Sequence, residues 1–478
     1  MSPSVRIYRK LNWLLIICYL ALTLFGWINI YASTFNAESA GIFSLANQSG
    51  VQLVWIGAGV IAALLILFVI NPKVYIELSW WFYAVAVLSL IAVLIAGKEV
   101  NGSRSWLPIW GGFGIQPAEF SKITTAICLA VTMSRYGFRL SSARDFAKAA
   151  GVILVPALLI SIEPEFGTLL VYCGLIFMFY REGMSGWVIA FIGAVILLFI
   201  CTLKYSPFVS VLVAVGMFGI MRAATSGHFT RYFLYYGAFI TAAAFLPELL
   251  DTGFMKPVAG IAPEYWLLII SVPFLMLFIV RGYRRKIRYW GTFLATMAVS
   301  VALIFSVDFI FRNVLKEHHR DRIENLLGIT QDLKGAGYNV NQSKIAIGSG
   351  GFAGKGFLEG TQTKFNFVPE QSTDFIFCAI GEEWGFLGSA LTLSLYFILI
   401  SGIAVTAEKQ RDKFVRIYGY SLASYLFVHV FINIGMTIGI MPVVGIPLPF
   451  ISYGGSSFLT FTIMLFIFLR LDIERWRY

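Results

Sequence analysis

Residues 342–356 read QSKIAIGSGGFAGKG, and residues 367–375 read FVPEQSTDF. Both stretches belong to one long polar segment, residues 312–374, in a chain that is 58% hydrophobic and only 13% charged. Connections longer than about 15 residues in compact proteins are usually functional or disordered. This segment is too rich in aromatic and β-branched residues for a disordered linker. We therefore predict that the chemistry of the protein takes place here.

Outside this segment, the chain is a succession of apolar stretches. A membrane-spanning helix needs about 17–25 mostly apolar residues, and the sequence predicts fourteen such spans. They are 11–33, 51–70, 79–97, 118–134, 147–162, 167–182, 186–203, 207–223, 232–247, 264–281, 291–311, 386–406, 415–437 and 451–470. The first is expected to be a retained helix rather than a signal peptide, because it is too long and lacks a small-x-small cleavage site. The predicted fold class is an all-α multi-pass membrane protein.

Positive charges predict the orientation of these spans. Lys and Arg concentrate in alternate connections, most clearly at Arg284-Arg285-Lys286, and cytoplasmic loops carry such an excess. The net charge of +11 is explained in this way, so we expect no nucleic-acid partner. Both termini are then expected in the cytoplasm. The segment 312–374 is expected on the outer face of the cytoplasmic (inner) membrane.

A first polar group lies at the outer end of the predicted span 118–134, where Gln116 and Pro117 precede Glu119 and Lys122. Proline is favourable at the first position of a helix, where its missing N–H is not needed. Glu119 and Lys122 would then be i,i+3 neighbours on one helix face. Two interpretations remain open: a salt bridge that closes the helix end, or a functional pair whose lysine holds a phosphate.

A second group is the pair of carboxylates at Glu163 and Glu165, in a short connection on the same predicted side. Such a pair could bind a cation or transfer a proton. The simpler alternative is a helix cap, with acidic residues near the positive end of a helix dipole. The four histidines have no metal-ligand spacing, and structural or surface roles are expected for them.

The glycines of the polar segment form a third group. Glycine permits close backbone approach and positive φ. Together with Lys344 and Lys355, they could form an anion-binding nest of N–H groups. The spacing of a Walker A loop is absent. Packing turns are the alternative for these glycines.

Asp374 stands where the polar segment meets an apolar stretch, with Glu370 four residues before it. This setting can perturb the pKa of a carboxylate, and a helix cap is the alternative role for Asp374. A fourth group, residues 445–457, contains paired prolines and glycines and predicts a broken backbone beside a span. Such backbone is tolerated at membrane depth only where protein or a wet cavity satisfies it. Packing and cavity-lining roles are both open.

These groups, in this order, closely resemble the SEDS family (shape, elongation, division and sporulation) of bacterial wall polymerases. The segment 342–375 resembles the RodA branch, related to FtsW, and so does NIGMTIGIMPVVGIPLPFISYGG at residues 433–455. The resemblance covers about residues 11–182 and 290–470. It implies a peptidoglycan glycosyltransferase that polymerises lipid II into β-1,4 glycan strands for cell elongation and rod shape. It also implies a class B penicillin-binding protein (a transpeptidase) and other elongation-complex membrane proteins as partners.

The resemblance also implies roles for individual residues. The catalytic aspartate of the family maps onto Asp374. Positions that would bind substrate or pyrophosphate map onto Gln116, Glu119, Lys122, Lys355, Glu370 and, less directly, Arg104. In many relatives an arginine directly precedes the matching tryptophan, whereas here Ser105 separates Arg104 from Trp106. The family's Gln-Pro-Asp sequence is replaced by Glu163-Pro164-Glu165, a possible secondary polar site.

Relatives usually have ten spans, so the resemblance divides the chain into a ten-helix core and an insertion of four helices. The expected parts are residues 1–182 (N-terminal membrane core), 183–289 (inserted spans), 290–311 (core helix), 312–374 (large extracytoplasmic loop) and 375–478 (C-terminal membrane core). The four inserted spans lie between residues 186 and 281. An even number of inserted spans keeps the large loop outside.

The expected mechanism is an inverting transfer in which Asp374 is the general base. Lys122, Lys355 and Arg104 would stabilise the pyrophosphate that leaves, and a divalent cation such as Mg or Mn could share this work. The rival function is a flippase for the lipid-linked precursor or an ion-coupled transporter, because many spans with broken segments suit transport too. A non-catalytic scaffold for a partner synthase is a third alternative.

Overall fold

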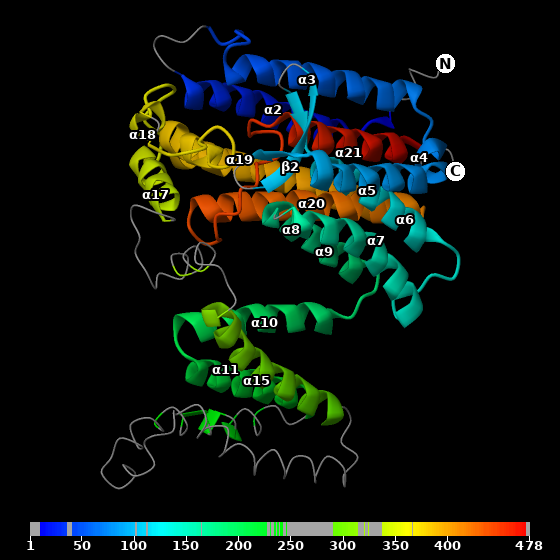
Figure 1. Cartoon of the computed structure of the whole chain (residues 1–478), viewed down its shortest axis with the longest axis vertical. Helices are drawn as coiled ribbons and strands as arrows, with labels where there is room; N and C mark the ends of the chain where they lie inside the picture. Colours follow the sequence, from blue (N-terminus) through cyan, green and yellow to red (C-terminus); the bar gives the residue numbers. More distant parts are fainter. Residues whose placement is uncertain are drawn as a thin grey trace. The chain divides into compact units, whose positions relative to one another are not determined.

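A computed structural model describes residues 10–35, 41–100, 103–110, 113–163, 165–226, 290–313, 337–365 and 367–474, with scattered positions between 230 and 245 and residues 320 and 324. The chain forms two compact units. One comprises residues 1–185 with 333–478, and the other comprises residues 186–332. Helices dominate the described residues of both units (Figure 1).

Eight described helices are long and apolar enough to cross a membrane. They are α2 (Trp13–Thr34), α3 continued by the π-helix η1 (Gln48–Val69), α5 (Ser79–Ala96), α7 (Ala143–Ile162), α10 (Gly186–Lys204), α19 (Ile376–Glu408), α20 (Lys413–Thr437) and α21 (Gly455–Glu474). Further predicted spans coincide with α6 (Pro117–Ser134), α8 (Phe166–Cys173), α9 (Leu175–Arg181), α11 (Pro207–Ser226) and α15 (Trp290–Asn313). The multi-pass architecture is thus confirmed. The predicted span 264–281 lies outside the described residues, as does most of 232–247, so the number fourteen stays a prediction.

The larger unit is a bundle organised around α20 and α21. The apolar windows of both helices are 83% buried, against 22% for α5, so α20 and α21 form the inside of the bundle and α5 its periphery. The beginning of α2 and the end of α21 lie at one end of this bundle (Figure 1). The short helices α17 (Tyr338–Gly350) and α18 (Thr361–Lys364) lie at the opposite end.

The all-α prediction misses a small antiparallel sheet between α5 and α6. Its strands are β1 (Lys98–Val100), β2 (Ser103–Trp110) and β3 (Phe113–Ile115), in the order β1-β2-β3. Lys98 pairs with Trp106, and Leu107 pairs with Ile115. Aromatic and β-branched residues favour strands, but this short polar stretch reads from sequence as a connection between spans.

The prediction of an open anion-binding nest in the polar segment is wrong for the described residues. Residues 338–350, which include Gly348 and Gly350, form α17 instead. The N–H groups of Lys355 and Gly356 donate to the carbonyls of Glu382 and Glu383, each at 3.0 Å. These donors therefore fasten the turn to α19 and do not point at an anion.

The smaller unit contains α10, α11 and α15, which pack around Leu198, Val211 and Ile304. The segment 290–311, predicted as a core helix, is thus part of α15 and packs on α10 and α11. The large loop predicted at 312–374 contains α17 and α18 in its described part.

A close contact between α17 and α19 depends on a glycine. A Cβ atom at Gly350 would lie 2.0 Å from the carbonyl oxygen of Gly381 and 2.8 Å from that of Glu382. No real side chain fits so close to backbone atoms. In contrast, a Cβ atom at Gly348, on the same helix, would meet nothing within 4 Å.

We expect Gly350→Val to separate α17 from α19 and to lower the thermal melting temperature of the purified protein in detergent. Overpacking costs about 1–3 kcal/mol, and more where backbone must move. Gly348→Ala is the matched control, and it should leave stability unchanged or raise it slightly, because alanine favours a helix over glycine by roughly 0.5–1 kcal/mol. Equal melting temperatures for the two variants would contradict the close packing.

Candidate active site

The chain between α20 and α21 is the centre of the site. Residues 444–449, which we name the connecting segment, have no helical structure. Carbonyl groups of this segment accept hydrogen bonds from buried side chains: Asn433 to Ile446, His429 to Pro447, and Tyr396 to Pro449. The predicted broken backbone is confirmed, and side chains satisfy its polar groups, as burial among apolar helices requires.

Asp374 lies in the turn just before α19 and adjoins the connecting segment. The Nδ2 of Asn433 donates to the main-chain carbonyl of Asp374 at 2.8 Å, so one amide group holds both pieces of chain. Gly445 has a positive φ of +66°, and a Cβ atom there would lie 3.3 Å from Oδ2 of Asp374. Phe375 occupies the N-cap of α19 without a side-chain capping bond, so the helix-cap alternative for Asp374 is wrong.

The electrostatic environment of Asp374 suits a proton acceptor. Burial raises the pKa of Asp374 to about 7, and the negative charge of Glu370 adds to the rise. Glu370 itself is oriented by Thr373, whose Oγ1 donates to Oε2 of Glu370 at 3.1 Å. No side chain or N–H group in the described part of the chain donates a hydrogen bond to the Asp374 carboxylate. A carboxylate with a pKa near 7 and free lone pairs is suited to general base catalysis at neutral pH.

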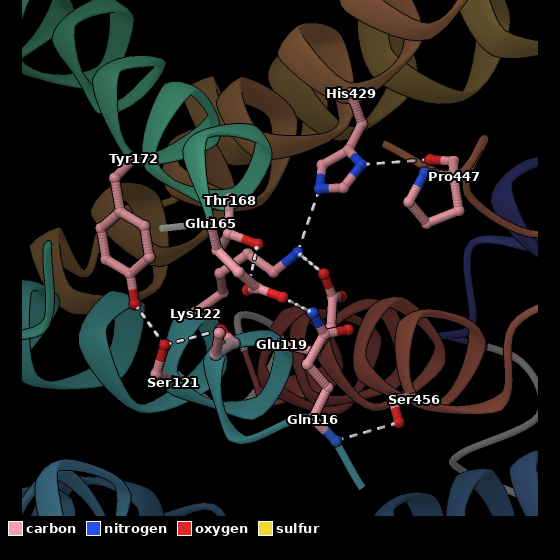
Figure 2. A network of polar contacts seen from close by, with 11 residues as sticks. Gln116, Glu119, Ser121, Lys122, Glu165, Thr168, Tyr172, His429, Pro447 and Ser456 are labelled. Atoms are coloured by element: carbon pink, nitrogen blue, oxygen red, sulfur yellow. Dashed lines mark hydrogen bonds and ion pairs between the residues drawn. The ribbon is translucent and has the colours of Figure 1, made fainter. Parts of the chain in front are cut away.

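His429 joins the connecting segment to a buried charge network, because one of its ring nitrogens faces Pro447 and the other faces Lys122 (Figure 2). The Nζ of Lys122 lies 2.7 Å from Oε1 of Glu119 and 3.0 Å from Nε2 of His429. The Nδ1 of His429 lies 3.2 Å from the carbonyl oxygen of Pro447, which can only accept, so Nδ1 carries the hydrogen and Nε2 accepts from Lys122. The predicted helix start at Pro117 and the predicted i,i+3 pair are confirmed.

Lys122 is fully buried, with 0% of its surface exposed, and its Nζ also faces the ring of Phe461 at 5.1 Å. Contact with a substrate phosphate would therefore require this network to open. The phosphate-binding role of Lys122 stays a prediction.

Gln116 and Glu165 form a neighbouring polar group (Figure 2). The Nε2 of Gln116 donates to Oε1 of Glu165, and Oγ1 of Thr168 lies 3.3 Å from Oε2 of the same carboxylate. Burial raises the pKa of Glu165, and burial together with the charge of Glu165 raises the pKa of Glu163 to about 8. Glu165 occupies the N-cap position of α8, near the positive end of the helix as the cap interpretation predicts, but its carboxylate makes no capping hydrogen bond.

The connecting segment brings this group towards Asp374. A Cβ atom at Gly167, at the start of α8, would lie 2.9 Å from the carbonyl oxygen of Val444 and 3.3 Å from that of Gly445. Gly445 is also the residue against which the Asp374 carboxylate lies. The secondary polar site and Asp374 therefore both adjoin the same few residues.

Lys355 takes part in a different arrangement. Its Nζ lies 2.7 Å from Oε1 of Glu382 and 2.7 Å from Oγ1 of Thr361. Glu382 also accepts from the main-chain N–H groups of Gln362 and Thr363, each at 2.9 Å. This carboxylate anchors the turn around residues 355–363 to α19. Asp374 lies before α19, and the helix from Ile376 to Glu382 adds roughly 9 Å along its axis, so the structure does not place Lys355 directly beside Asp374.

Arg104 lies on β2, where it pairs in register with Glu99 of β1. Its side chain lies outside what the structure describes, so its predicted role is neither supported nor opposed. Among the described residues, no group of three or more His, Cys, Asp or Glu side chains could hold a metal ion. The divalent cation thus stays a prediction without a located site.

Three side chains that matter here were not singled out from sequence: Asn433, His429 and Glu382. Asn433 and His429 are four residues apart on α20, in a span that is otherwise largely apolar. Polar side chains at membrane depth are costly and are usually functional or structural anchors. That signal was present for both residues, whereas the partners of each could not be found from spacing alone.

Comparison with known proteins decides the family. A sequence family described as cell cycle protein, comprising FtsW, RodA and SpoVE, matches residues 12–224 and 261–476. The chain belongs to this family. Its relatives include the peptidoglycan glycosyltransferase RodA of Treponema pallidum, 29% identical over 457 residues, which cover 95% of this chain and 96% of that protein. The peptidoglycan glycosyltransferase MrdB of Escherichia coli K12 is 30% identical over 389 residues, which cover 81% of this chain and 76% of the relative.

Solved structures share the fold. A chain from a structure described as the coordination of polymerization and crosslinking by a peptidoglycan synthase complex aligns with a TM-score of 0.61. It is 20% identical, and the alignment covers 98% of this chain and 99% of that one. RodA of Thermus thermophilus aligns with a TM-score of 0.55 at 19% identity and covers 98% of both chains. At these identities, the comparison supports the fold alone.

The buried ion pair generates a prediction about stability. Lys122→Met leaves the Glu119 carboxylate buried without its cation, and breaking a buried pair in this way costs about 3–5 kcal/mol. The double variant Glu119→Gln/Lys122→Met removes both charges and should recover much of that loss. Thermal melting in detergent measures both. Equal melting temperatures for the single and double variants would show that the charge on Glu119 is not the cause.

Proposed function

We propose that this family member is a peptidoglycan glycosyltransferase that joins lipid-linked disaccharide units (lipid II) into β-1,4 glycan strands. The observation that carries the proposal is the Asp374 carboxylate. It has a pKa of about 7, has no hydrogen-bond donor among the described residues and is held in position by Asn433 through its own carbonyl. The names of the relatives, which are peptidoglycan glycosyltransferases, support the same reaction class.

In the proposed reaction, Asp374 accepts the proton of the acceptor sugar's C4 hydroxyl group. The oxygen attacks the anomeric carbon of the donor, and the bond from that carbon to the pyrophosphate oxygen breaks. One displacement converts an α-linked donor into a β-1,4 bond and releases a polyprenyl pyrophosphate. Negative charge develops on the leaving group, so cations or N–H dipoles near it lower the barrier.

Glu370 contributes by its charge. It lies near enough to raise the pKa of Asp374, which increases the strength of Asp374 as a base. Gln116, Glu119 and Glu165 are proposed to shape the neighbouring polar site, with Lys122 neutralising part of their charge. We propose that Lys122, Lys355 and Arg104 bind substrate or pyrophosphate, and that the ion pairs of Lys122 with Glu119 and of Lys355 with Glu382 open when they do so.

We also propose that both termini are cytoplasmic and that Asp374 is on the outer face of the cytoplasmic membrane. The excess of Lys and Arg in alternate connections supports this orientation. The position of α17 at the bundle end opposite the beginning of α2 and the end of α21 agrees with it (Figure 1). A class B penicillin-binding protein is the proposed partner, in keeping with the synthase complex that shares the fold.

A role in elongation rather than division is proposed because the sequence of residues 342–375 resembles that of the RodA branch.

Transport of the lipid-linked precursor is the second candidate function, because α6 carries a buried lysine and a buried glutamate within the bundle. Purified protein in liposomes with labelled lipid II separates the two functions. Glycan ladders support the polymerase, and movement of the precursor across the bilayer without ladders supports the transporter. A non-catalytic scaffold predicts neither.

Asp374→Asn is expected to reduce the rate of glycan polymerisation by about 10²-fold or more, because a well-placed general base contributes about 10²–10⁴-fold. The amide has the same shape as the carboxylate, so the melting temperature should stay close to that of the wild type. Polymerisation on denaturing gels and thermal melting are measured on the same preparations. Normal strand synthesis by the folded variant would refute the assignment.

The pH dependence follows from the raised pKa. Asp374 must be ionised to accept a proton, so the rate should rise with pH through about 7 and then level off. Glu370→Gln removes a negative charge that raises this pKa, and it should shift the rising limb to lower pH. Thr373→Val, which removes only the hydroxyl that contacts Glu370, is the comparison variant and should cause a smaller shift. A profile that does not move in Glu370→Gln would contradict the electrostatic coupling.

A further inference from the structure

The leaving pyrophosphate needs a cation, and two of the predicted lysines are already engaged. Lys122 is buried between Glu119 and His429, and Lys355 is paired with Glu382. Lys344 differs from both. It is exposed on α17, and in the described part of the chain it has neither an ion pair nor a hydrogen bond.

The ammonium group of Lys344 lies against the loop that also contacts Asp374. A Cβ atom at Gly439, just beyond the end of α20, would lie 2.5 Å from Nζ of Lys344. Further along the same loop, a Cβ atom at Gly445 would lie 3.3 Å from Oδ2 of Asp374. One short piece of chain is therefore flanked by a free ammonium group and by the proposed base.

Packing fixes α17 relative to the turn that carries Asp374. Ala346 of α17 shares a buried apolar cluster with Phe375 and Cys378, the residues around the start of α19. Ser343, next to Lys344, donates to the carbonyl of Thr437 at 2.9 Å, at the end of α20. Contacts of α17 with α19 and α20 therefore fix the backbone at Lys344, although the side chain itself is flexible.

The chemistry of this position suits a phosphate. A lysine ammonium is a compact point charge that binds phosphate oxygens through charge-assisted hydrogen bonds. The carboxyl end of α20 carries only about half a negative charge, which favours an ammonium group there without neutralising it. We propose that Lys344 binds a phosphate of the pyrophosphate that links the disaccharide to its polyprenyl chain. This inference rests on the proposed function.

The test measures the binding of undecaprenyl pyrophosphate to the purified full-length protein in detergent. Lys344→Gln should weaken binding at least about tenfold, since a hydrogen bond to a charged group is lost, while Lys344→Arg keeps most of the affinity. Lys364→Gln is the matched control, because Lys364 is an exposed lysine on α18, in the same polar segment, and its loss removes the same charge. Unchanged binding in Lys344→Gln would overturn the inference.

Two further arms identify the source of the phosphate and exclude a structural role. Inorganic pyrophosphate should compete with the prenyl ligand in the wild type and much less in Lys344→Gln. Vesicles of phosphatidylglycerol should bind both proteins equally, and a Lys344-dependent difference there would assign the residue to a general lipid headgroup and overturn the inference. A lower melting temperature in Lys344→Gln with unchanged ligand binding would show that Lys344 only stabilises the end of α20, which also overturns it.

Failure of the inference and failure of the proposed function give different results. If the wild type polymerises lipid II and Lys344→Gln both binds and polymerises normally, the function stands and the inference falls. If the wild type makes no glycan but binds undecaprenyl pyrophosphate through Lys344, the binding site stands and the polymerase assignment falls. Polymerisation rates measured over a range of lipid II concentrations should show a higher KM in Lys344→Gln.

Discussion

The site depends on the hydrogen bonds that satisfy the backbone of the connecting segment, residues 444–449. Two prolines prevent this segment from continuing a helix, and the carbonyls of Ile446, Pro447 and Pro449, in buried or half-buried residues, need hydrogen-bond donors from the protein. Asn433, His429 and Tyr396 supply the missing donors. Because Asn433 also holds the carbonyl of Asp374, the same bonds that satisfy the broken backbone fix the position of the turn that carries Asp374.

Around this segment, two buried charged groups have well-defined partners among the described residues, and Asp374 differs from both. Lys122 contacts both Glu119 and His429. Glu382 accepts hydrogen bonds from Lys355 and from two main-chain N–H groups. Asp374 instead meets the bare backbone of Gly445 and the charge of Glu370. A carboxylate left without a donor in such surroundings costs stability, and the proposed role of Asp374 as a proton acceptor accounts for that cost.

The sequence predicted those features that depend on residues close together in the chain. Apolar length predicted the spans, Pro117 predicted the start of α6, and the spacing of Glu119 and Lys122 predicted their ion pair. It could not predict that Lys122 meets His429, because 307 residues separate them. The sheet at 98–115 and the helix α17 were missed for another reason: short polar stretches with several glycines have weak local preferences, and packing against neighbouring elements decides their structure.

The central claim is that an acidic group at position 374 acts on the outer face of the membrane, and cysteine labelling tests that claim most directly. Asp374→Cys would be made in a chain whose five native cysteines are replaced, with Lys413→Cys, at the start of α20, as the opposite-side control. A membrane-impermeant maleimide is applied to spheroplasts. The account predicts labelling at position 374 before lysis and labelling at position 413 only after lysis; the reverse pattern would contradict it.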